Sequence, residues 1–182
     1  MPLVLAAGGA IRFGSAKQLA LINGVPMIRR TITHLLGAGR GPCVVVTGAV
    51  HMQIARALDE LEVTCVHNPK WYEGMAGSIE VGLAWIRDEM PEAEAVLIAL
   101  ADQPFITAED FRRMTDSFDG NAIVAARYPD GPGVPAIFPK SDWKALEQLS
   151  GDVGARQVIR QRTETITVVL SDTRDIDHPG QI

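Results

Sequence analysis

The sequence contains few cysteines, few aromatic residues and no excess of basic residues. Only Cys43 and Cys65 occur among its 182 residues, and both stand in apolar runs. We expect both to be small buried hydrophobic residues in a reducing compartment, because two such cysteines do not make a disulfide framework. The formal net charge is −5, and the chain shows no basic stripe of the kind that duplex-binding proteins carry. This composition argues against a disulfide-rich secreted protein and against a nucleic-acid partner.

Long apolar runs are absent as well. No apolar stretch reaches the length of a membrane span, and the N-terminus shows no basic segment followed by a long apolar one. We therefore expect a cytoplasmic protein that does not contact a membrane. Hydrophobic residues make up 47% and charged residues 21%, an ordinary globular balance. A chain of this length is expected to form one domain over residues 1–182.

Short apolar, often β-branched runs alternate with segments of helical periodicity along the whole chain. The expected strands are 3–5, 42–47, 63–66, 94–101, 121–126, 136–138 and 166–170. The expected helices are 26–36, 52–58, 76–90, 108–118, 142–149 and 155–162. The alternation predicts an α/β fold, three-layer and Rossmann-like, with a mainly parallel sheet and helices on both faces.

Turn and capping signals separate these elements. The Asn23-Gly24 pair between apolar residues predicts a hairpin, and Pro and Gly predict loops at 68–75 and 130–135. Residues after Ser171 are expected to form a partly ordered polar tail. Two helix starts also carry capping residues, which are Thr107 with Asp110, and Ser141 or Asp142.

The first strand runs into a glycine-rich loop, residues 5–19, which reads LAAGGAIRFGSAKQL. Its glycines allow positive φ and a close approach of the backbone to a ligand. The cations Arg12 and Lys17 lie within this glycine frame. Backbone N–H groups in such a turn bind anions, and nearby cations strengthen the binding. The loop is predicted to bind phosphate, and the alternative is a strand-to-helix turn with two solvated cations.

Two common phosphate loops are excluded by spacing. Gly9 and Gly14 have the separation of the Walker A motif, but Ser15 occupies the position of its lysine and Lys17 comes too late. The dinucleotide-binding fingerprint also fails, because Ala10 follows Gly8 and Gly9 where the second glycine of that motif is needed.

Asp102 follows the long apolar run 94–101, which places it at the end of a buried strand. Ligands of open α/β sheets bind beyond the carboxyl ends of the strands, so Asp102, the first loop and the loop at Asn68 should share one edge. Carboxylates and substrate phosphates are the usual ligands of Mg²⁺. Asp102 is therefore a candidate Mg²⁺ ligand, and the alternative is that it only begins the Asp-Gln-Pro turn.

Several motifs occur in order along the chain. They are Leu5-Ala-Ala-Gly, Arg12-Phe-Gly14, Lys17, Asn68 with Trp71, Gly74-Met75 and Ser78, Asp102-Gln-Pro104, and Gly151-Asp-Val-Gly-Ala-Arg156. Together they resemble the MobA-like nucleotidyltransferases, most closely the molybdenum cofactor cytidylyltransferase branch, over residues 3 to about 170. The resemblance implies a nucleotide-diphospho-sugar transferase-like fold. It also implies transfer of a nucleotidyl group from a nucleoside triphosphate to a phosphorylated acceptor, with release of pyrophosphate.

The resemblance also implies roles for single residues. Arg12, Lys17 and Asp102 would be catalytic, the two cations binding phosphates and Asp102 holding Mg²⁺. Asp152 would be a second metal ligand, and the alternative is a turn that caps the following helix. The nucleotide-binding residues implied in this way are Leu5, Ala6, Ala7, Gly8, Gly9, Arg12, Gly14, Lys17, Asn68, Gly74 and Ser78.

The substrates follow from the same resemblance. Ala6-Ala7-Gly8 favours CTP, since Leu-Ala-Gly-Gly resembles the guanylyltransferases. Molybdopterin is the leading acceptor, with transient contact to a molybdoenzyme. The alternatives are GTP, another phosphorylated acceptor such as a sugar or polyol phosphate, and a non-catalytic accessory protein that delivers the cofactor. The acceptor phosphate is already ionised at neutral pH and needs no general base, which agrees with four scattered histidines.

Overall fold

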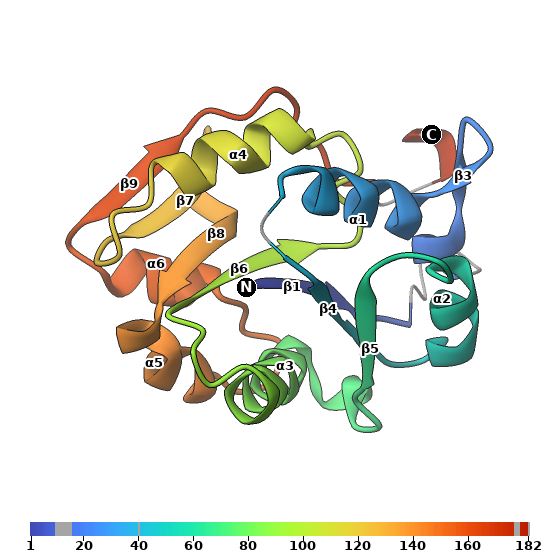
Figure 1. Cartoon of the computed structure of the whole chain (residues 1–182), viewed down its shortest axis with the longest axis horizontal. Helices are drawn as coiled ribbons and strands as arrows, with labels where there is room; N and C mark the ends of the chain where they lie inside the picture. The colour runs from blue at the N-terminus through green and yellow to red at the C-terminus, as the bar shows by residue number, and fades with distance from the viewer. Residues whose placement is uncertain (10–15, 40, 177–178, 182) are drawn as a thin grey trace.

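The computed structural model describes residues 1–9, 16–39, 41–176 and 179–181. Its centre is a seven-stranded sheet of order β5-β4-β1-β6-β8-β7-β9 (Figure 1). All neighbouring strands are parallel except at β8, which runs antiparallel to β6 and β7. The strands are β1 Pro2–Ala6, β4 Cys43–Thr47, β5 Val63–His67, β6 Ala95–Leu100, β7 Ile123–Tyr128, β8 Gly131–Pro139 and β9 Thr165–Val168. The predicted α/β fold with a mainly parallel sheet is confirmed.

Helices cover both faces of the sheet (Figure 1). On one face lie α1 Met27–Gly37, α2 His51–Ala57 and α4 Ala108–Asp116, and on the other lie α3 Met75–Glu89, α5 Trp143–Glu147 and α6 Arg156–Gln161. The predicted Asn-Gly hairpin is present as β2 Leu21–Ile22 and β3 Val25–Pro26, with positive φ at both turn residues. No helix among the described residues is long and apolar enough to span a membrane.

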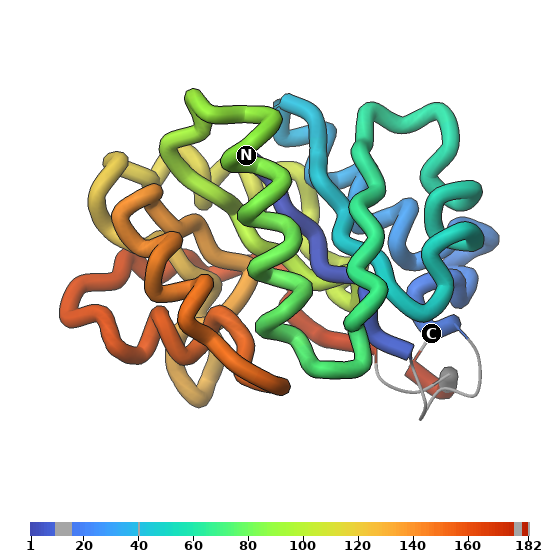
Figure 2. Tube along the Cα trace, turned by 90° about the horizontal axis from the view of Figure 1, so that it is seen from below, coloured from blue at the N-terminus to red at the C-terminus, as the bar shows by residue number. Residues whose placement is uncertain are grey.

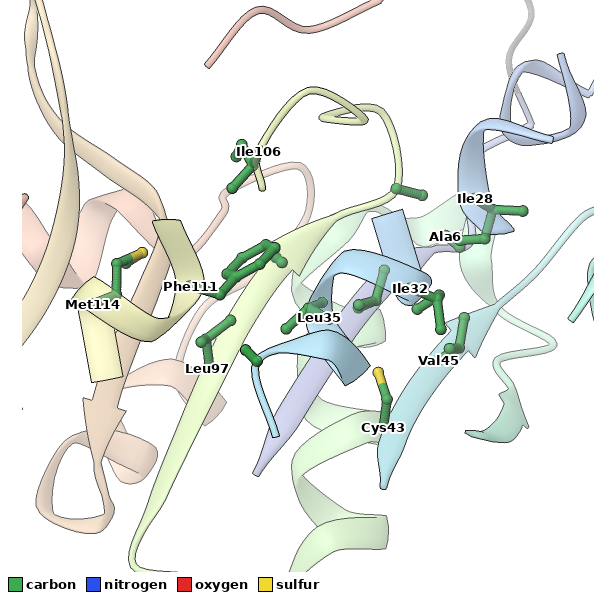
Figure 3. Packing of buried hydrophobic residues seen from close by; sticks show 14 of the residues in the cluster. Ala6, Ile28, Ile32, Leu35, Cys43, Val45, Leu97, Ile106, Phe111 and Met114 are labelled. Carbon is green, nitrogen blue, oxygen red and sulfur yellow. The ribbon is translucent and has the colours of Figure 1, made fainter. Parts of the chain in front are cut away.

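Alternate residues of the central strands supply two separate cores. Val4 and Ala6 of β1 pack into the core beneath α1 and α4, whereas Leu3 and Leu5 face the core beneath α3. Figure 3 shows the first core, in which Phe111 of α4 lies with residues of α1 over the sheet. Every residue of β1 and β4 is buried, which explains why these strands read as continuous apolar runs.

The loop predicted at 130–135 is wrong after its first residue, because Asp130 lies in a turn but residues 131–135 begin the nine-residue strand β8. They pair with β7 through Pro132 opposite Arg127 and Gly133 opposite Ala126. The neighbour on the other side, β6, pairs with β8 only at residues 136–139. Proline and glycine are therefore tolerated here, because one edge of this half of the strand needs no partner.

The predicted capping box of α4 is confirmed, and Asp142 is the N-cap residue of α5 by position but does not cap it by a side-chain hydrogen bond. Asp110 and Thr107 exchange both hydrogen bonds of the box. At α5, neither Ser141 nor Asp142 makes a capping hydrogen bond, and a turn of 3-10 helix, Lys140–Asp142, leads into the helix. The Asp142 carboxylate instead accepts hydrogen bonds from the Arg162 guanidinium at 2.8 and 3.2 Å.

Both cysteines are free, and their burial differs. Cys43 is fully buried in β4, as expected, and burial raises the pKa of its thiol to about 12. Cys65 lies on β5, the outermost strand of the sheet, and is only half-buried, because no other strand in the described part of the chain pairs with that edge. The expectation of full burial is therefore wrong for Cys65.

Candidate active site

A cavity of about 370 Å³ lies where the carboxyl ends of β1 and β6 meet the start of α3. This is the edge at which a parallel sheet presents its loops to a ligand. The cavity is lined by Leu5, Ala6, Ala7, Gly8, Lys17, Gln18, Trp71, Tyr72, Gly74, Met75, Ser78, Leu100, Ala101, Asp102 and Asp152. Most residues predicted to bind nucleotide or metal thus surround one space. Arg12 and Gly14 lie outside the described residues.

Lys17 and Asp102 form an ion pair in the cavity wall. Lys17 Nζ lies 2.9 Å from Asp102 Oδ2, although the two residues are 85 positions apart in the chain. The other carboxylate oxygen, Oδ1, is buried and has no hydrogen-bond partner among the described residues. Leaving a buried acceptor unpaired costs free energy, so Asp102 is a fitting ligand for a cation that enters the cavity.

Gln18 fixes the end of β1, a role that the sequence analysis missed. Its side-chain Nε2 donates hydrogen bonds to the backbone carbonyl of Gly8 at 2.7 Å and to that of Ala6 at 3.2 Å. Only the amide nitrogen can donate to two carbonyl groups, which determines the orientation of the side chain. Gln18 is 6% exposed, and this polar residue in a glycine-rich loop was the only signal available.

Trp71 packs against the backbone of the first loop. A Cβ built on Gly9 would lie 2.8 Å from the Trp71 ring, and one on Gly48 would lie 2.5 Å from Trp71 Cβ. Glycine is therefore required at both positions for the indole to fit. The ring of Tyr72 meets that of Trp71 edge to face, with centroids 6.2 Å apart. Gly9 thus accommodates a wall residue and does not itself line the cavity.

Asn68 supports the cavity from behind. It is 2% exposed, and its Nδ2 donates a hydrogen bond to Ser78 Oγ at 3.0 Å. Its Oδ1 accepts a hydrogen bond from the Lys70 backbone at 2.9 Å. Ser78 lines the cavity whereas Asn68 does not, so Asn68 orients the serine and the turn that follows β5.

Gly74 brings the 151–152 turn against the start of α3. Gly74 has φ 117°, and a Cβ there would lie 2.2 Å from the backbone of Gly151. The Ala76 N–H donates a hydrogen bond to the Gly151 carbonyl at 3.1 Å. This contact places Asp152 in the cavity wall together with Asp102. No group of three or more metal-binding side chains occurs within the described part of the chain, so phosphate oxygens and water would supply the other ligands of a metal ion here.

A partly buried hydrogen-bond network starts at Gln103, the residue after Asp102. Gln103 Nε2 donates a hydrogen bond to the Tyr128 hydroxyl at 2.8 Å, and that hydroxyl donates to the Val134 carbonyl. Burial, together with the charges of Asp175 and Asp102, raises the pKa of Tyr128 to about 12, so the phenol stays protonated. The network joins the Asp-Gln-Pro turn to the β7–β8 hairpin.

The motif at 151–156 is tied to the same hairpin. The Arg156 guanidinium lies 2.9 Å from an Asp130 carboxylate oxygen and donates a hydrogen bond to the Pro132 carbonyl at 3.2 Å. The two ends of the cavity wall, at Asp102 and at Asp152, are therefore both supported by residues 128–134.

Solved structures with similar folds come from several organisms. Rv0371c from Mycobacterium tuberculosis H37Rv is 27% identical with a TM-score of 0.83, over 98% of this chain and 93% of that chain. Rv0371c in complex with manganese gives 25% identity and a TM-score of 0.77, over 97% and 90%. The nucleotidyl transferase Mth528 from Methanothermobacter is 23% identical with a TM-score of 0.84, over 98% of this chain and 92% of that chain. The inositol-1-phosphate CTP transferase from T. maritima is 17% identical with a TM-score of 0.75, over 100% of this chain and 90% of that chain.

The curated proteins gave no match. A family model for the MobA-like NTP transferase domain matches residues 2–166, which is nearly the whole chain and includes every described wall residue of the cavity. Family and fold support a nucleotidyltransferase enzyme. The chain belongs to the family of the MobA-like NTP transferase domain.

Proposed function

We propose that this protein transfers CMP from CTP to the phosphate of molybdopterin and releases pyrophosphate. The observation that carries the proposal is the Lys17–Asp102 pair. It places a cation and a carboxylate with one unpartnered oxygen in the wall of one cavity. The preference for CTP rests on Ala6-Ala7-Gly8, which line that cavity and whose small side chains allow backbone groups to approach a base.

The reaction needs positioning and charge neutralisation more than covalent help from the protein. An oxygen of the acceptor phosphate attacks the α-phosphorus of CTP, and the bond from that phosphorus to the bridging β-phosphate oxygen breaks. Pyrophosphate leaves with the electron pair. Lys17 binds triphosphate oxygens and stabilises the negative charge that develops on the leaving group. Arg12 is proposed to share this role.

Asp102 and Asp152 are proposed to hold Mg²⁺. The orphaned Oδ1 of Asp102 fits an ion with oxygen ligands, and both carboxylates line the cavity. A bound Mg²⁺ would draw charge away from the phosphates and orient them for the displacement. The manganese complex of Rv0371c supports a divalent ion in proteins of this type.

The direct test is pyrophosphate release from CTP, GTP, ATP or UTP with molybdopterin, with and without Mg²⁺. We expect turnover with CTP and Mg²⁺ only. The Asp102→Asn variant should lose at least about 100-fold in kcat, a typical loss when a group that stabilises transition-state charge is removed. Asp88→Asn, at the exposed end of α3, is the matched control and should keep wild-type activity. Full turnover by Asp102→Asn would remove this residue from the mechanism.

Each alternative predicts a different result in the same experiments. A ligand at one hundred times its Kd should stabilise the fold by about 2.7 kcal/mol, which thermal unfolding detects. Stabilisation by GTP rather than CTP would indicate a guanylyltransferase. Activity with inositol, sugar or polyol phosphates and none with molybdopterin would show that the acceptor is one of those phosphates. Inositol phosphate is included because one similar structure is that of the inositol-1-phosphate CTP transferase from T. maritima. Nucleotide or cofactor binding without pyrophosphate release would indicate a protein that delivers cofactor to a molybdoenzyme.

A further inference from the structure

The chain after β9 returns to the edge of the cavity, where the Ile176 N–H meets the Asp102 carbonyl. Residues 171–176, which we name the C-terminal strap, follow the last strand and lie beyond the part matched by the family model. Figure 1 shows this red segment passing α4 on its way to the side of α1 and β3. In Figure 2 the red strap likewise runs towards the blue segments near the start of the chain. The expected polar tail is thus ordered by contacts at both ends.

The first end of the strap is held by a buried carboxylate. The Ser171 N–H and hydroxyl donate hydrogen bonds to Asp110 Oδ1 at 3.0 and 2.9 Å. Asp110 is fully buried at the start of α4. Since each hydrogen bond to an ionised group is worth more than a neutral one, this end is firmly attached to the α4 layer.

The second end is held by a buried side chain and a backbone hydrogen bond. Ile176 is 1% exposed and packs with Ile22 and Met27, and Phe105 covers the same cluster. The Ile176 N–H donates a hydrogen bond to the backbone carbonyl of Asp102 at 3.0 Å. The strap therefore contacts the residue that carries the carboxylate of the cavity wall.

A third contact secures the turn that follows Asp102. The Arg174 guanidinium lies over the Phe105 ring, 4.9 Å from its centroid, and is paired with Asp172 at 2.6 Å. Phe105 follows Asp102 by three residues. The strap thus contacts both ends of the turn 102–105, just past the last residue of β6, Leu100.

We propose that the C-terminal strap is a positioning element for Asp102, and that Ile176 is its main positioning residue. The sheet orders the chain up to Ala101, whose N–H donates a hydrogen bond to the Leu5 carbonyl at 3.2 Å. The Ile176 N–H then holds the carbonyl of the following residue, Asp102. Without this hydrogen bond the Asp102 backbone would be free to shift, and a shift of its Cα would carry the carboxylate away from Lys17. The inference rests on the proposed function, in which Asp102 holds a divalent ion.

The test compares two shortened chains and two point variants. One chain ends at Ile176 and keeps the anchor, whereas the other ends at Asp175 and lacks it. Ile176→Ala removes the buried side chain, and Leu146→Ala removes a fully buried aliphatic side chain from the core on the other face as a matched control. The readouts are kcat and KM for CTP, Mn²⁺ binding by the electron paramagnetic resonance of the free ion, and thermal unfolding.

We expect Ile176→Ala and the chain ending at Asp175 to lose about 10- to 100-fold in kcat, as small misplacements of a catalytic group do. They should also need more Mn²⁺ for half-saturation in the presence of CTP. The chain ending at Ile176 should match the wild type. Leu146→Ala should lower Tm but keep kcat and Mn²⁺ affinity when assayed well below its Tm.

The possible failures are distinguishable. Wild-type kcat and Mn²⁺ affinity in Ile176→Ala would overturn the strap proposal and leave the proposed function standing. A parallel loss in Leu146→Ala would also overturn it, because the effect would then be general destabilisation. If the wild type releases no pyrophosphate, the proposed function fails, and Mn²⁺ binding still decides the strap: equal affinity in wild type and Ile176→Ala, or no binding by either, would overturn it.

Discussion

The buried carboxylate of Asp110 predicts a measurable dependence of stability on pH. Burial opposes its ionisation and raises the pKa, but hydrogen bonds from Thr107, Arg113 and Ser171 outweigh burial and lower the pKa from 3.8 to about 2. A lowered pKa in the folded state means that the ionised form stabilises the fold. This stabilisation is complete above the unfolded pKa near pH 4 and is lost as the pH falls towards 2.

The size of the effect follows from the same values. A decrease from 3.8 to about 2 corresponds to about 2.4 kcal/mol of unfolding free energy, at about 1.36 kcal/mol per pH unit. Asparagine cannot replace the carboxylate, because both oxygens accept: Oδ2 from the Thr107 N–H and hydroxyl, and Oδ1 from Ser171 and Arg113. An amide NH₂ would face at least two donors in either orientation. We therefore expect Asp110→Asn to lower the unfolding free energy at pH 7 by about 3–5 kcal/mol.

Urea unfolding at pH 7, 4 and 2.5 provides the assay, with Asp88→Asn as the exposed control. The free-energy difference between the wild type and Asp110→Asn should be largest at pH 7 and should shrink by about 1.6 kcal/mol as the pH falls to 2.5. Asp88→Asn should follow the wild type throughout. A difference between wild type and Asp110→Asn that stays constant from pH 7 to 2.5 would refute the assignment of this stabilisation to the Asp110 carboxylate.

Two further predictions concern the cavity wall. Gln18→Glu should lower the unfolding free energy by about 3 kcal/mol, because a carboxylate oxygen would face the two carbonyls that the amide now satisfies, whereas the exposed Gln148→Glu should change it little. A loss under 1 kcal/mol in chemical unfolding would contradict this role. Gly74→Ala should cost about 2 kcal/mol and reduce nucleotide-dependent thermal stabilisation, since its φ is 117° and its Cβ would displace the Gly151 backbone. In Gly77→Ala the new Cβ meets only Asn68 Nδ2 at 3.8 Å, an ordinary contact, so its unfolding free energy should be unchanged or slightly raised. Equal unfolding free energies of Gly74→Ala and Gly77→Ala would contradict the argument.

The central strands could be predicted because burial on both faces leaves an unambiguous apolar pattern. Val44, Val45 and Val46 are each fully buried in β4, so hydrophobicity alone marks the strand. The meeting of Lys17 and Asp102 followed from topology, since parallel strands present their carboxyl ends at one edge. The cavity could thus be placed from the order of the elements. The side chains that support the cavity wall could not be predicted in this way.

Residues that stabilise the wall were missed because their partners are distant and their types are not diagnostic. Gln18 is one glutamine in a loop, and only the folded structure shows that two carbonyls meet its amide. The strand at 131–139 was missed because glycine and proline ordinarily mark turns, and pairing on one edge makes them acceptable here. In both places local propensity was overruled by tertiary contacts.

The strap shows the same limit at the active site. Its composition is polar, and the residue that anchors it, Ile176, stands alone among charged and small residues, so no periodic pattern reveals burial. Asp110, which caps α4, also binds Ser171 and so anchors the start of the strap whose other end contacts Asp102. A substitution at Asp110 is therefore expected to weaken the attachment of the strap as well as the fold. If the strap positions Asp102, Asp110→Asn should lose activity at temperatures where it remains folded, and Leu146→Ala should not.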